Sequence, residues 1–344
     1  MILVTGGAGY IGSHTCVELI QGGYDVVVLD NLCNSSREAV RRVEEITGKS
    51  ITLEVVDLLD AEETKRVVRE HPFEAVIHFA GLKAVGESVQ LPLRYYDNNL
   101  TGTLNLLQAL QQHGPRRIVF SSSATVYGDP ESLPIREDFP RGATNPYGRT
   151  KLIIEEMLAD LAASDPRWKM TSLRYFNPVG AHESGRIGEQ PNGTPNNLMP
   201  YLMEVAVGQR PHLRVFGNDY PTPDGTGVRD YVHVVDLARG HLAALRGLEG
   251  VAGHVAYNLG TGVGNSVLEV VEAARRATGR EIECIIESRR PGDVAECYAD
   301  PSRAAEDLGW VAQRSLAQMV EDAWRWELRK QRDPSATEVA KIRS

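Results

Sequence analysis

Tyr147 and Lys151 are four positions apart, a spacing that places two side chains on one face of a helix with Cβ atoms about 5–6 Å apart. Asn145 and Pro146 precede them and are typical of an N-cap and a first helical residue. Tyr147 would then lie in the first turn, where the helix dipole favours a phenolate. Because a free tyrosine titrates near pH 10, work near pH 7 requires about 4 kcal/mol in favour of the anion. With Lys151 and a bound cation as sources, we predict a phenolate that takes a proton from an alcohol while hydride leaves its carbon.

A run of hydroxyl side chains supplies a second reactive group. The segment from Ser121 to Thr125 directly follows an apolar run that ends at Phe120, so it is predicted at the carboxyl edge of a sheet, where ligands bind in doubly wound folds. We expect Ser123 to hydrogen-bond the same substrate oxygen as Tyr147, with Thr125 assisting. Two alternatives remain open at this point, since serines after a strand also cap turns and a Tyr-x-x-x-Lys spacing also occurs on solvated helices.

A glycine-rich loop predicts a dinucleotide site. Gly7, Gly9 and Gly12 satisfy G-x-G-x-x-G directly after an apolar run, and Gly6, Gly9 and Gly12 give a second regular spacing. Glycine is needed where backbone approaches a pyrophosphate, and the following helix N-terminus then binds the diphosphate. Asp30 ends the next apolar run 18 residues after Gly12, where a carboxylate accepts hydrogen bonds from a ribose 2′-hydroxyl and repels a 2′-phosphate. NAD is therefore favoured over NADP, while an isolated motif of this kind also fits an ordinary turn.

The elements that must position these groups alternate along the chain. Short apolar runs of the kind buried on both faces of a parallel sheet are separated by stretches with helical spacing. This alternation predicts an α/β fold with a doubly wound parallel Rossmann sheet and a smaller C-terminal α/β lobe that binds substrate. The expected strands include residues 2–4, 26–29, 51–56, 75–79, 118–120, 171–173 and 255–259, and the expected helices include residues 11–22, 100–113, 151–163, 199–208 and 234–248.

The composition changes after Phe176, where Gly, Pro and Asn become frequent. We expect residues 1–176, together with about 231–260, to form an NAD-binding domain. Residues 177–230 and 261–330 would form the substrate-binding domain, and residues 331–344 would fray. The segment from His233 to Asp236 is interpreted as structural, with a helix beginning at Asp236.

Charge and motif content exclude several classes of protein. Across 344 residues, 37 Lys and Arg stand against 46 Asp and Glu, which leaves a net charge of −9 and no basic surplus for nucleic acid. Four widely spaced cysteines fit a reducing compartment rather than a disulfide framework or a zinc site. With neither a signal-peptide pattern nor an apolar stretch of about 20 residues, the chain is expected to be cytoplasmic and independent of membranes. It has no metal-ligand spacing and no G-x-S-x-G esterase motif.

The chain resembles the UDP-galactose 4-epimerases, a family of extended short-chain dehydrogenases/reductases. The resemblance runs from the glycine loop to about Trp326. It is carried by the segments 9–14, 30–35, 78–89, 121–128, 174–181, 195–201, 216–231 and 257–267. It implies an isomerase in which NAD stays bound and is not consumed. Hydride would pass from sugar C4 to NAD and return to the other face after the keto sugar rotates about its diphosphate bonds.

The resemblance also implies roles for individual residues. Tyr147 would be the base and Ser123 would assist it, while Lys151 would hold the ribose and lower the pKa of the phenol. The residues expected to line the cofactor are Gly6, Gly9, Tyr10, Ile11, Gly12, Asp30, Asn31, Leu32, Cys33, Asn34, Ser35, Asp57, Leu58, Phe79, Ala80, Gly81, Leu82, Lys83, Asn98, Tyr147, Lys151 and Phe176. Those expected to bind the UDP-sugar are Lys83, Ser123, Tyr147, Asn177, Asn197, Leu198, Phe216, Arg229, Arg290, Asp293 and Cys297, with Arg289 as the alternative to Arg290 at the diphosphate.

Cys297 is a departure from part of the family. Some bacterial relatives carry a tyrosine at this position, and members with a small residue there tend to accept N-acetylated sugars. We therefore expect UDP-N-acetylglucosamine and UDP-N-acetylgalactosamine to be interconverted as well, although Cys297 also fits the role of a small buried residue. The family further implies a homodimer, formed through the helices near 100–113 and 151–163.

Two other functions are compatible with parts of this sequence. The first is an NAD-dependent sugar-nucleotide 4,6-dehydratase or net dehydrogenase. A dehydratase needs further acid–base groups beside the serine, where this chain has Ala124 and Thr125, and a net dehydrogenase would release NADH. The second is an NAD-bound regulator without activity, which would tolerate the loss of Tyr147 or Lys151, whereas both are present.

Overall fold

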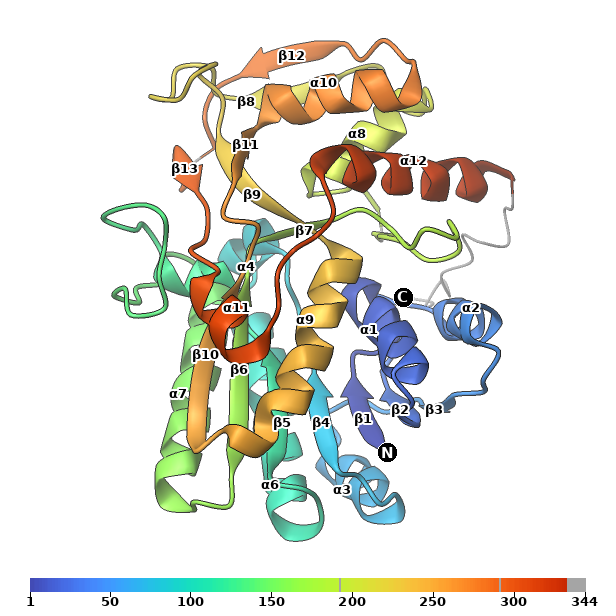
Figure 1. Cartoon of the computed structure of the whole chain (residues 1–344), viewed down its shortest axis with the longest axis vertical. Coiled ribbons are helices and arrows are strands. Elements are labelled where there is room, and N and C mark those ends of the chain that lie inside the picture. The colour runs from blue at the N-terminus through green and yellow to red at the C-terminus, as the bar shows by residue number, and fades with distance from the viewer. Residues whose placement is uncertain (192, 291, 333–344) are drawn as a thin grey trace.

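Seven parallel strands form the main sheet of the protein, in the order β10-β6-β5-β4-β1-β2-β3 (Figure 1). The computed structural model describes residues 1–191, 193–290 and 292–332. Chain order reverses direction between β1 and β4, which is the crevice where doubly wound folds bind nucleotides. The strands are β1 (Ile2–Thr5), β2 (Val26–Leu29), β3 (Thr52–Glu54), β4 (Ala75–His78), β5 (Arg117–Ser121), β6 (Lys169–Tyr175) and β10 (Gly253–Leu259). The predicted fold class is confirmed.

The inner strands are buried on both faces because successive side chains enter two different cores. In β1, Ile2 and Val4 pack into one apolar cluster and Leu3 packs into the other. In β2, Val28 packs into the first of these clusters and Leu29 packs into the second. This two-sided burial explains why these strands read as continuous apolar runs rather than as an alternation of apolar and polar residues.

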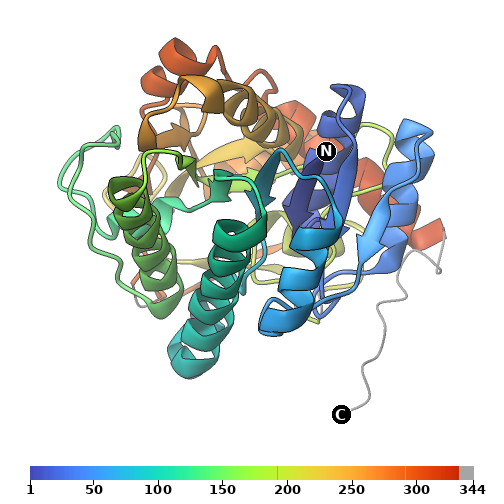
Figure 2. The ribbon, with the colours of Figure 1, turned by 90° about the horizontal axis from the view of Figure 1, so that it is seen from below.

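Helices cover both faces of the main sheet (Figures 1 and 2). One cluster joins the sheet to α1 (Tyr10–Gln21), α2 (Arg37–Thr47) and α9 (Val234–Gly247). The other joins it to α3 (Ala61–Glu70), α6 (Gly102–His113) and α7 (Pro146–Ser164). Between β4 and α6 the chain forms α4 (Val85–Gln90), α5 (Pro92–Tyr96) and a π-helical turn, η1 (Asp97–Thr101). A 3₁₀ turn, η2 (Ala124–Tyr127), follows β5, and another, η3 (Leu248–Gly250), follows α9.

A second lobe lies beyond the carboxyl ends of the main strands (Figure 1). Its core joins buried residues of α8 (Leu198–Ala206), α10 (Val267–Thr278) and α12 (Leu316–Arg332). Its strands are β7 (Asn177–Val179), β8 (Leu213–Phe216), β9 (Val228–His233), β11 (Gly264–Ser266), β12 (Cys284–Glu287) and β13 (Glu296–Cys297). β9 is the centre of one sheet, pairing with β7, β11 and β13, while β8 and β12 form another. The chain then crosses back along α11 (Ser302–Leu308), which packs beside β10.

Most predicted elements are confirmed within a few residues, and three boundaries are corrected. The run at 51–56 yields only three strand residues, because β3 lies at one edge of the sheet and pairs with β2 alone. The helix expected over residues 234–248 is confirmed as α9, whereas the start suggested at Asp236 is wrong, because the His233 side chain caps the helix by accepting a hydrogen bond from the Val235 N–H at 3.0 Å. The helix α12 continues to Arg332, so the expectation that residues 331 and 332 fray is wrong, and residues 333–344 lie outside the described residues.

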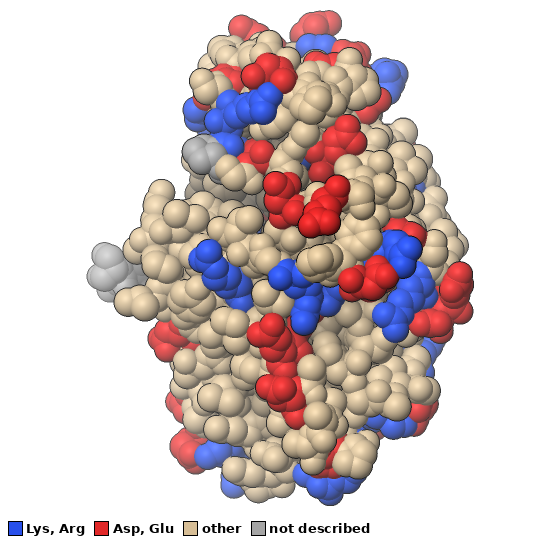
Figure 3. Space-filling view, turned by 90° about the vertical axis from the view of Figure 1, so that its left-hand side faces the viewer, with Lys and Arg blue, Asp and Glu red and all other residues tan. Residues whose placement is uncertain are grey.

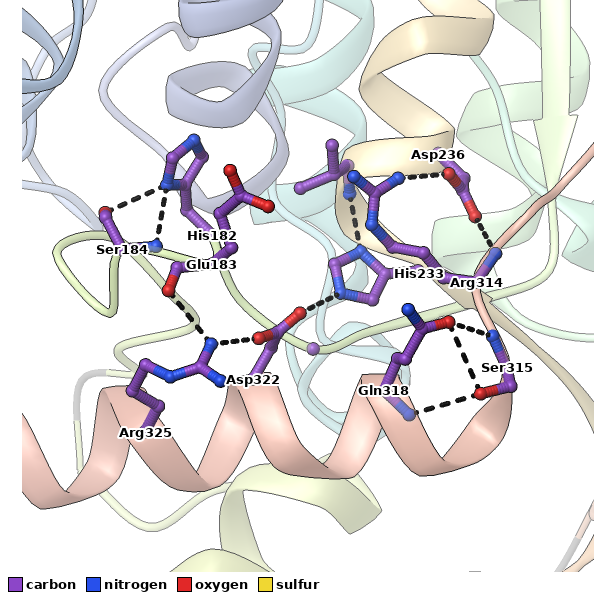
Figure 4. A network of polar contacts seen from close by, with 12 residues as sticks. His182, Glu183, Ser184, His233, Asp236, Arg314, Ser315, Gln318, Asp322 and Arg325 are labelled. Carbon is purple, nitrogen blue, oxygen red and sulfur yellow. Dashed lines mark hydrogen bonds and ion pairs between the residues drawn. The ribbon is translucent and has the colours of Figure 1, made fainter.

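Buried polar contacts tie α9 to α12 and the segment before it (Figure 4). The other ring nitrogen of His233 lies 3.1 Å from an Asp322 carboxylate oxygen of α12. Asp236, in the first turn of α9, accepts hydrogen bonds from the backbone N–H groups of Gln313 and Arg314 and pairs with the Arg314 guanidinium. The structural interpretation of His233 and Asp236 is therefore confirmed, because they join segments that are 89 and 77 residues apart, respectively.

Candidate active site

The glycine loop between β1 and α1 makes close backbone contacts. Gly6 has φ +70°, and a Cβ there would lie 2.7 Å from the backbone nitrogen of Ala80. A Cβ on Gly12 would lie 2.3 Å from the carbonyl oxygen of Gly6. Within the described residues, no side chain caps α1 at Gly9. The backbone N–H groups in the first turn of α1 are therefore able to bind an anion. At Gly6 and Gly12 the loop is packed too closely to accept a side chain.

Asp30 lies directly beneath this loop, at the end of β2. Its carboxylate accepts hydrogen bonds from the N–H of Ala8 at 3.1 Å, from the N–H of Leu32 at 2.9 Å and from the Ser35 hydroxyl at 2.8 Å. Burial raises the pKa of Asp30, and the same three donors act against that rise. Leu32 adopts φ +59°, which turns the chain sharply after the carboxylate. Asp30 is thus held by donors from the glycine loop and from the segment that follows β2.

The three predicted reactive side chains meet at the carboxyl edge of β5. As predicted, α7 begins with Asn145 as N-cap, which accepts from the Gly148 N–H at 2.9 Å, and with Pro146 as first residue. Tyr147, only 6% exposed, is hydrogen-bonded to Ser123. The Ser123 hydroxyl also accepts from the hydroxyl of Thr125 at 3.0 Å. The structure therefore brings Ser123, Thr125 and Tyr147 together.

Lys151 lies one turn further along α7, with its Nζ 6.0 Å from the centre of the Tyr147 ring. Its ammonium group donates to the carbonyl oxygen of Ser121 at 2.7 Å and lies 4.7 Å from the centre of the Phe120 ring. Burial lowers the pKa of Lys151 to about 8. Burial also raises the pKa of Tyr147 well above its usual value, followed by repulsion from Tyr175, while the Ser123 hydrogen bond lowers it. In the chain alone, the phenol is therefore a proton donor, and a phenolate needs a further positive charge beside it.

A buried asparagine that the sequence analysis missed fixes the loop after β4. We predicted Asn98, whose side chain donates to Oδ1 of its neighbour Asn99 at 3.0 Å. Asn99, 2% exposed, accepts from the Leu82 N–H at 2.8 Å and donates to the Thr150 hydroxyl of α7 at 3.0 Å. A Cβ on Gly81 would lie 3.2 Å from the same Asn99 oxygen. The available sequence signal was that Asn98 and Asn99 are adjacent, so that either could have been the functional asparagine.

Glu189 is a second residue that sequence reasoning missed. One of its carboxylate oxygens lies 3.1 Å from Lys83 Nζ and accepts from the Asn197 amide at 2.7 Å. Its backbone oxygen accepts from the Trp326 indole at 3.1 Å. Glu189 thus links Lys83, a cofactor-side candidate, to Asn197, a substrate-side candidate at the start of α8. No motif marks such a carboxylate, because its partners are distant in sequence.

The predicted arginines converge in the second lobe. Arg290 stacks over Phe216, with its guanidinium carbon 4.8 Å from the ring centre, and donates to Asp293 at 3.0 Å. Arg229, which lies opposite Cys297 in the strand register, donates to the Val228 carbonyl oxygen at 2.8 Å.

Tyr231 shows that the two arginines share one neighbourhood. Burial raises its pKa to about 12, and the nearby charges of Arg229 and Arg290 act to lower it. Arg289 turns elsewhere, since it donates to Asp219 at 2.7 Å and stacks on Tyr220. Of the adjacent pair, Arg290 is therefore the one grouped with Arg229, Phe216 and Asp293.

The remaining candidates follow the strand ends or border the second lobe. Asn31 donates to Asp57 at 2.9 Å, and Leu58 packs against Gly102. Tyr10 donates to the Gly180 carbonyl oxygen at 2.7 Å. Cys33, Asn34, Gly81 and Asn177 are exposed, whereas Leu82 and Phe176 are buried. The candidates follow the carboxyl ends of β1 to β6 or belong to the second lobe.

Surface charge and ligand geometry add two observations. On the face shown in Figure 3, acidic and basic side chains are interspersed over its whole height. Among residues 1–191, 193–290 and 292–332, no three His, Cys, Asp or Glu side chains are grouped so that they could hold a metal ion. In the same part of the chain, every helix is either too short or too polar to cross a bilayer.

Known proteins match this chain over almost its whole length. The sequence profile of a family described as GDP-mannose 4,6 dehydratase matches residues 3–323. The UDP-glucose 4-epimerase of Bacillus subtilis (strain 168) is 63% identical over 326 residues, which is 95% of this chain and 96% of that protein. The chain belongs to the UDP-glucose 4-epimerase family. The resemblance stated from the sequence motifs is thereby confirmed.

Solved epimerases share the fold as well as the sequence. The UDP-glucose 4-epimerase of Bifidobacterium longum, crystallised with NAD+ and UDP, superimposes with a TM-score of 0.93 at 52% identity, covering 97% of this chain and 99% of that one. The enzyme of Stenotrophomonas maltophila, with bound NAD and formylated UDP-arabinopyranose, gives a TM-score of 0.94 at 50% identity, covering 96% and 98%. The two-lobed architecture is therefore that of epimerases known to bind NAD together with a uridine nucleotide.

Proposed function

We propose that this protein is an NAD-dependent isomerase that interconverts UDP-galactose and UDP-glucose by reversing the configuration at sugar C4. The observation that carries the proposal is the meeting of Ser123 and Tyr147 at the carboxyl edge of β5, with Lys151 one turn along α7, in a chain 63% identical to an epimerase over almost its full length.

The residues present fit an NAD molecule. A Cβ on Gly6 or Gly12 would clash with neighbouring backbone atoms, so the loop requires glycine at both positions. The first turn of α1 has no side-chain cap at Gly9, and its N–H groups can bind a diphosphate. Asp30 stands at the end of β2 with a carboxylate suited to ribose hydroxyls and unsuited to a 2′-phosphate. When bound, NAD would supply the hydride acceptor and donor that reversal of the configuration at sugar C4 requires.

Tyr147 moves the proton of the sugar 4-hydroxyl. Its phenol is buried, so the low dielectric strengthens every charge placed beside it. Lys151 presents an ammonium group on the same face of α7, and Ser123 holds the tyrosine oxygen through a hydrogen bond that favours the phenolate. Ser123 and Tyr147 together would hydrogen-bond the 4-oxygen of the sugar, which would hold the sugar in position during both hydride transfers.

The second lobe would hold the UDP moiety. The substrate diphosphate is an anion, and Arg229 with Arg290 supplies two guanidinium groups in one neighbourhood. We assign Arg290 rather than Arg289 to the diphosphate, because Arg289 is engaged with Asp219 and Tyr220. The other residues in this proposed set are Lys83, Asn177, Asn197, Leu198, Phe216 and Asp293.

Cys297 would widen the range of sugars. It lies half-buried in β13 opposite Arg229, and a thiol there leaves space that a tyrosine ring would fill. We propose that UDP-N-acetylglucosamine and UDP-N-acetylgalactosamine are therefore also interconverted. A Cys297→Tyr variant should lose the N-acetyl activity and keep the UDP-galactose activity. Equal loss of both activities would reject this role for Cys297.

A 4,6-dehydratase is the second candidate, favoured only by the description of the matched family profile. Its chemistry needs acid–base groups beside the serine, and Ala124 and Thr125 stand there. The two candidates differ in product mass, because a dehydratase removes one water from the sugar and an epimerase leaves the mass unchanged.

The assembly and the compartment are proposed on other grounds. Exposed apolar side chains gather on α4, the segment after it, α5 and α6, namely Val89 at 63%, Leu91 at 47%, Leu93 at 80% and Leu104 at 44%. We propose a homodimer that covers them, with α6 and α7 at the interface. Cys16, Cys284 and Cys297 take part in no disulfide bond, which fits a reducing compartment, and we propose the cytoplasm.

The decisive experiment incubates the purified protein with UDP-galactose, adds no cofactor, and measures the appearance of UDP-glucose. We expect turnover without added NAD, because the bound cofactor ends each cycle unchanged. The absence of UDP-glucose formation from a protein that carries bound NAD would reject the proposed function.

A further inference from the structure

Three consecutive serines at the end of β5 engage three side chains that are spaced four residues apart on α7. Because positions i, i+4 and i+8 share one face of a helix, the loop and the helix meet along a single line of contacts. Residues 121–123, which we call the serine loop, therefore contact α7 at three points. The proposed reaction uses only the contacts that involve Tyr147 and Lys151. The pairs are Ser123 with Tyr147, Ser121 with Lys151 at 2.7 Å, and Ser122 with Glu155 at 2.5 Å.

Glu155 is an unusual residue to find at the third point, because it is fully buried. The Arg174 guanidinium of β6 contacts both of its oxygens, the shortest distance being 2.7 Å, and Arg141 lies 3.3 Å from one of them. Burial raises the pKa of Glu155, but the hydrogen bonds and charge of Arg174 together with the Ser122 hydroxyl bring it below its ordinary value. The side chain is therefore a carboxylate, and the Ser122 hydroxyl donates to a charged acceptor.

We propose that Glu155 is a positioning residue of the epimerisation: through the Ser122 hydroxyl it fixes the loop that presents the Ser121 carbonyl oxygen to Lys151 and the Ser123 hydroxyl to Tyr147. The inference rests on the proposed function, since those two side chains are its proposed reactive groups. Arg174 anchors Glu155 in turn, and it also donates to the Tyr127 hydroxyl of the turn η2 at 2.9 Å. Both ends of the segment from Ser122 to Tyr127 are thus held by one ion pair.

Glu155 also acts on Lys151 through its charge. Burial lowers the pKa of the Lys151 ammonium, and the Glu155 carboxylate, one turn away on α7, raises it. The other groups that face Lys151 are the Tyr147 phenol of α7, the Phe120 ring of β5 and His78 of β4. Burial lowers the pKa of His78 to about 3, so this ring is neutral near pH 7 and Glu155 is the acidic group in this set.

Ser122→Ala removes the hydrogen bond between Ser122 and Glu155 and keeps the ion pair between Glu155 and Arg174. Ser172→Ala is the matched control, because Ser172 is also fully buried, lies on the adjacent strand β6, and donates or accepts a hydrogen bond with His254 at 2.8 Å rather than with the serine loop. We expect Ser122→Ala to lower kcat about tenfold or more, as the loss of a hydrogen bond to a charged group does, with KM, bound NAD and melting temperature close to those of Ser172→Ala. An unchanged kcat, or a kcat loss that merely follows lost NAD, would overturn the proposal.

Glu155→Gln tests the charge with a readout that needs no turnover. The chain has seven lysines, so ¹³C-labelling of the lysine ε-carbons gives a spectrum in which Lys151 can be titrated directly. Removing the carboxylate should lower the pKa of Lys151 by roughly one unit or more and move the alkaline limb of kcat in the same direction, whereas Ser122→Ala should leave that pKa in place. An unshifted Lys151 in folded Glu155→Gln protein rejects the role of Glu155 even if the protein proves not to be an epimerase. A wild-type protein without turnover rejects only the proposed function.

Discussion

The Gly12→Ala substitution tests the glycine loop with a single added carbon. Gly12 lies in the first turn of α1, and an added Cβ would be 2.3 Å from the carbonyl oxygen of Gly6 and 2.8 Å from the α-carbon of Gly7. Both atoms belong to backbone and cannot rotate away, so the loop or the helix must shift. Helix propensity favours alanine by up to about 1 kcal/mol, and overpacking of this kind costs about 1–3 kcal/mol.

Gly86→Ala is the matched control, because Gly86 also lies in a helix, α4, and a Cβ there has no neighbour within 4 Å among the described residues. It should leave the melting temperature unchanged or raise it slightly. Gly12→Ala should lower the melting temperature and weaken NAD binding about tenfold to a hundredfold, which corresponds to about 1.4–2.8 kcal/mol.

Bound NAD can be measured in the acid extract of the purified protein, and stability can be measured by thermal melting. If Gly12→Ala keeps its NAD and melts like Gly86→Ala, then the loop tolerates a side chain at this position. In that case the close backbone packing around Gly12 would not be what shapes the cofactor site.

Four further outcomes are expected. Tyr147→Phe should lose about 10²- to 10⁴-fold in kcat and keep its NAD, and full activity would remove Tyr147 from its role as base. Turnover should fall as the pH rises through about 8, because burial lowers the pKa of the Lys151 ammonium to about 8 and the positive charge beside Tyr147 is then lost. Between pH 8 and 10.5, Lys151 is neutral in the folded protein and still protonated in the unfolded chain, so its contribution to the free energy of unfolding should rise with pH over that interval. Glu189→Ala should raise KM for UDP-galactose about three- to tenfold with little change in kcat, because Lys83 and Asn197 lose their shared partner, and a change confined to kcat would contradict this. Asp30→Asn should weaken NAD retention and admit NADP, and continued exclusion of NADP by the variant would show that another group selects the cofactor.

The sequence indicated the local features of the site because each depends on neighbours in the chain. The Asn145 cap, the first position of Pro146 and the placement of Tyr147 one turn before Lys151 are all properties of a single helix. The apolar runs likewise identified the inner strands, since burial on both faces leaves a continuous pattern. The boundary errors arose where an edge strand pairs on one side only, as in β3, and where a side chain such as His233 caps a helix.

The groups that sequence reasoning missed are carboxylates and amides whose partners are distant. Glu189 bonds Lys83 across 106 positions, and Asn99 bonds Thr150 across 51. Glu155 reads as an ordinary helical glutamate beside Glu156, and only the fold shows that the first is fully buried while the second faces solvent. Which of two adjacent acids faces inward depends on the phase of the helix against the sheet, and a single sequence does not fix that phase.

The position of β10 has a consequence for how the chain is made. One of the two edge strands of the main sheet comes from residues 253–259, although its neighbour β6 ends at Tyr175 and the sheet begins at Ile2. During synthesis, β6 therefore has one unpaired side until about three quarters of the polypeptide has emerged from the ribosome. An open strand edge of this kind pairs readily with other chains, so we expect truncated products that end before Gly253 to aggregate, while those that include Leu259 can close the sheet.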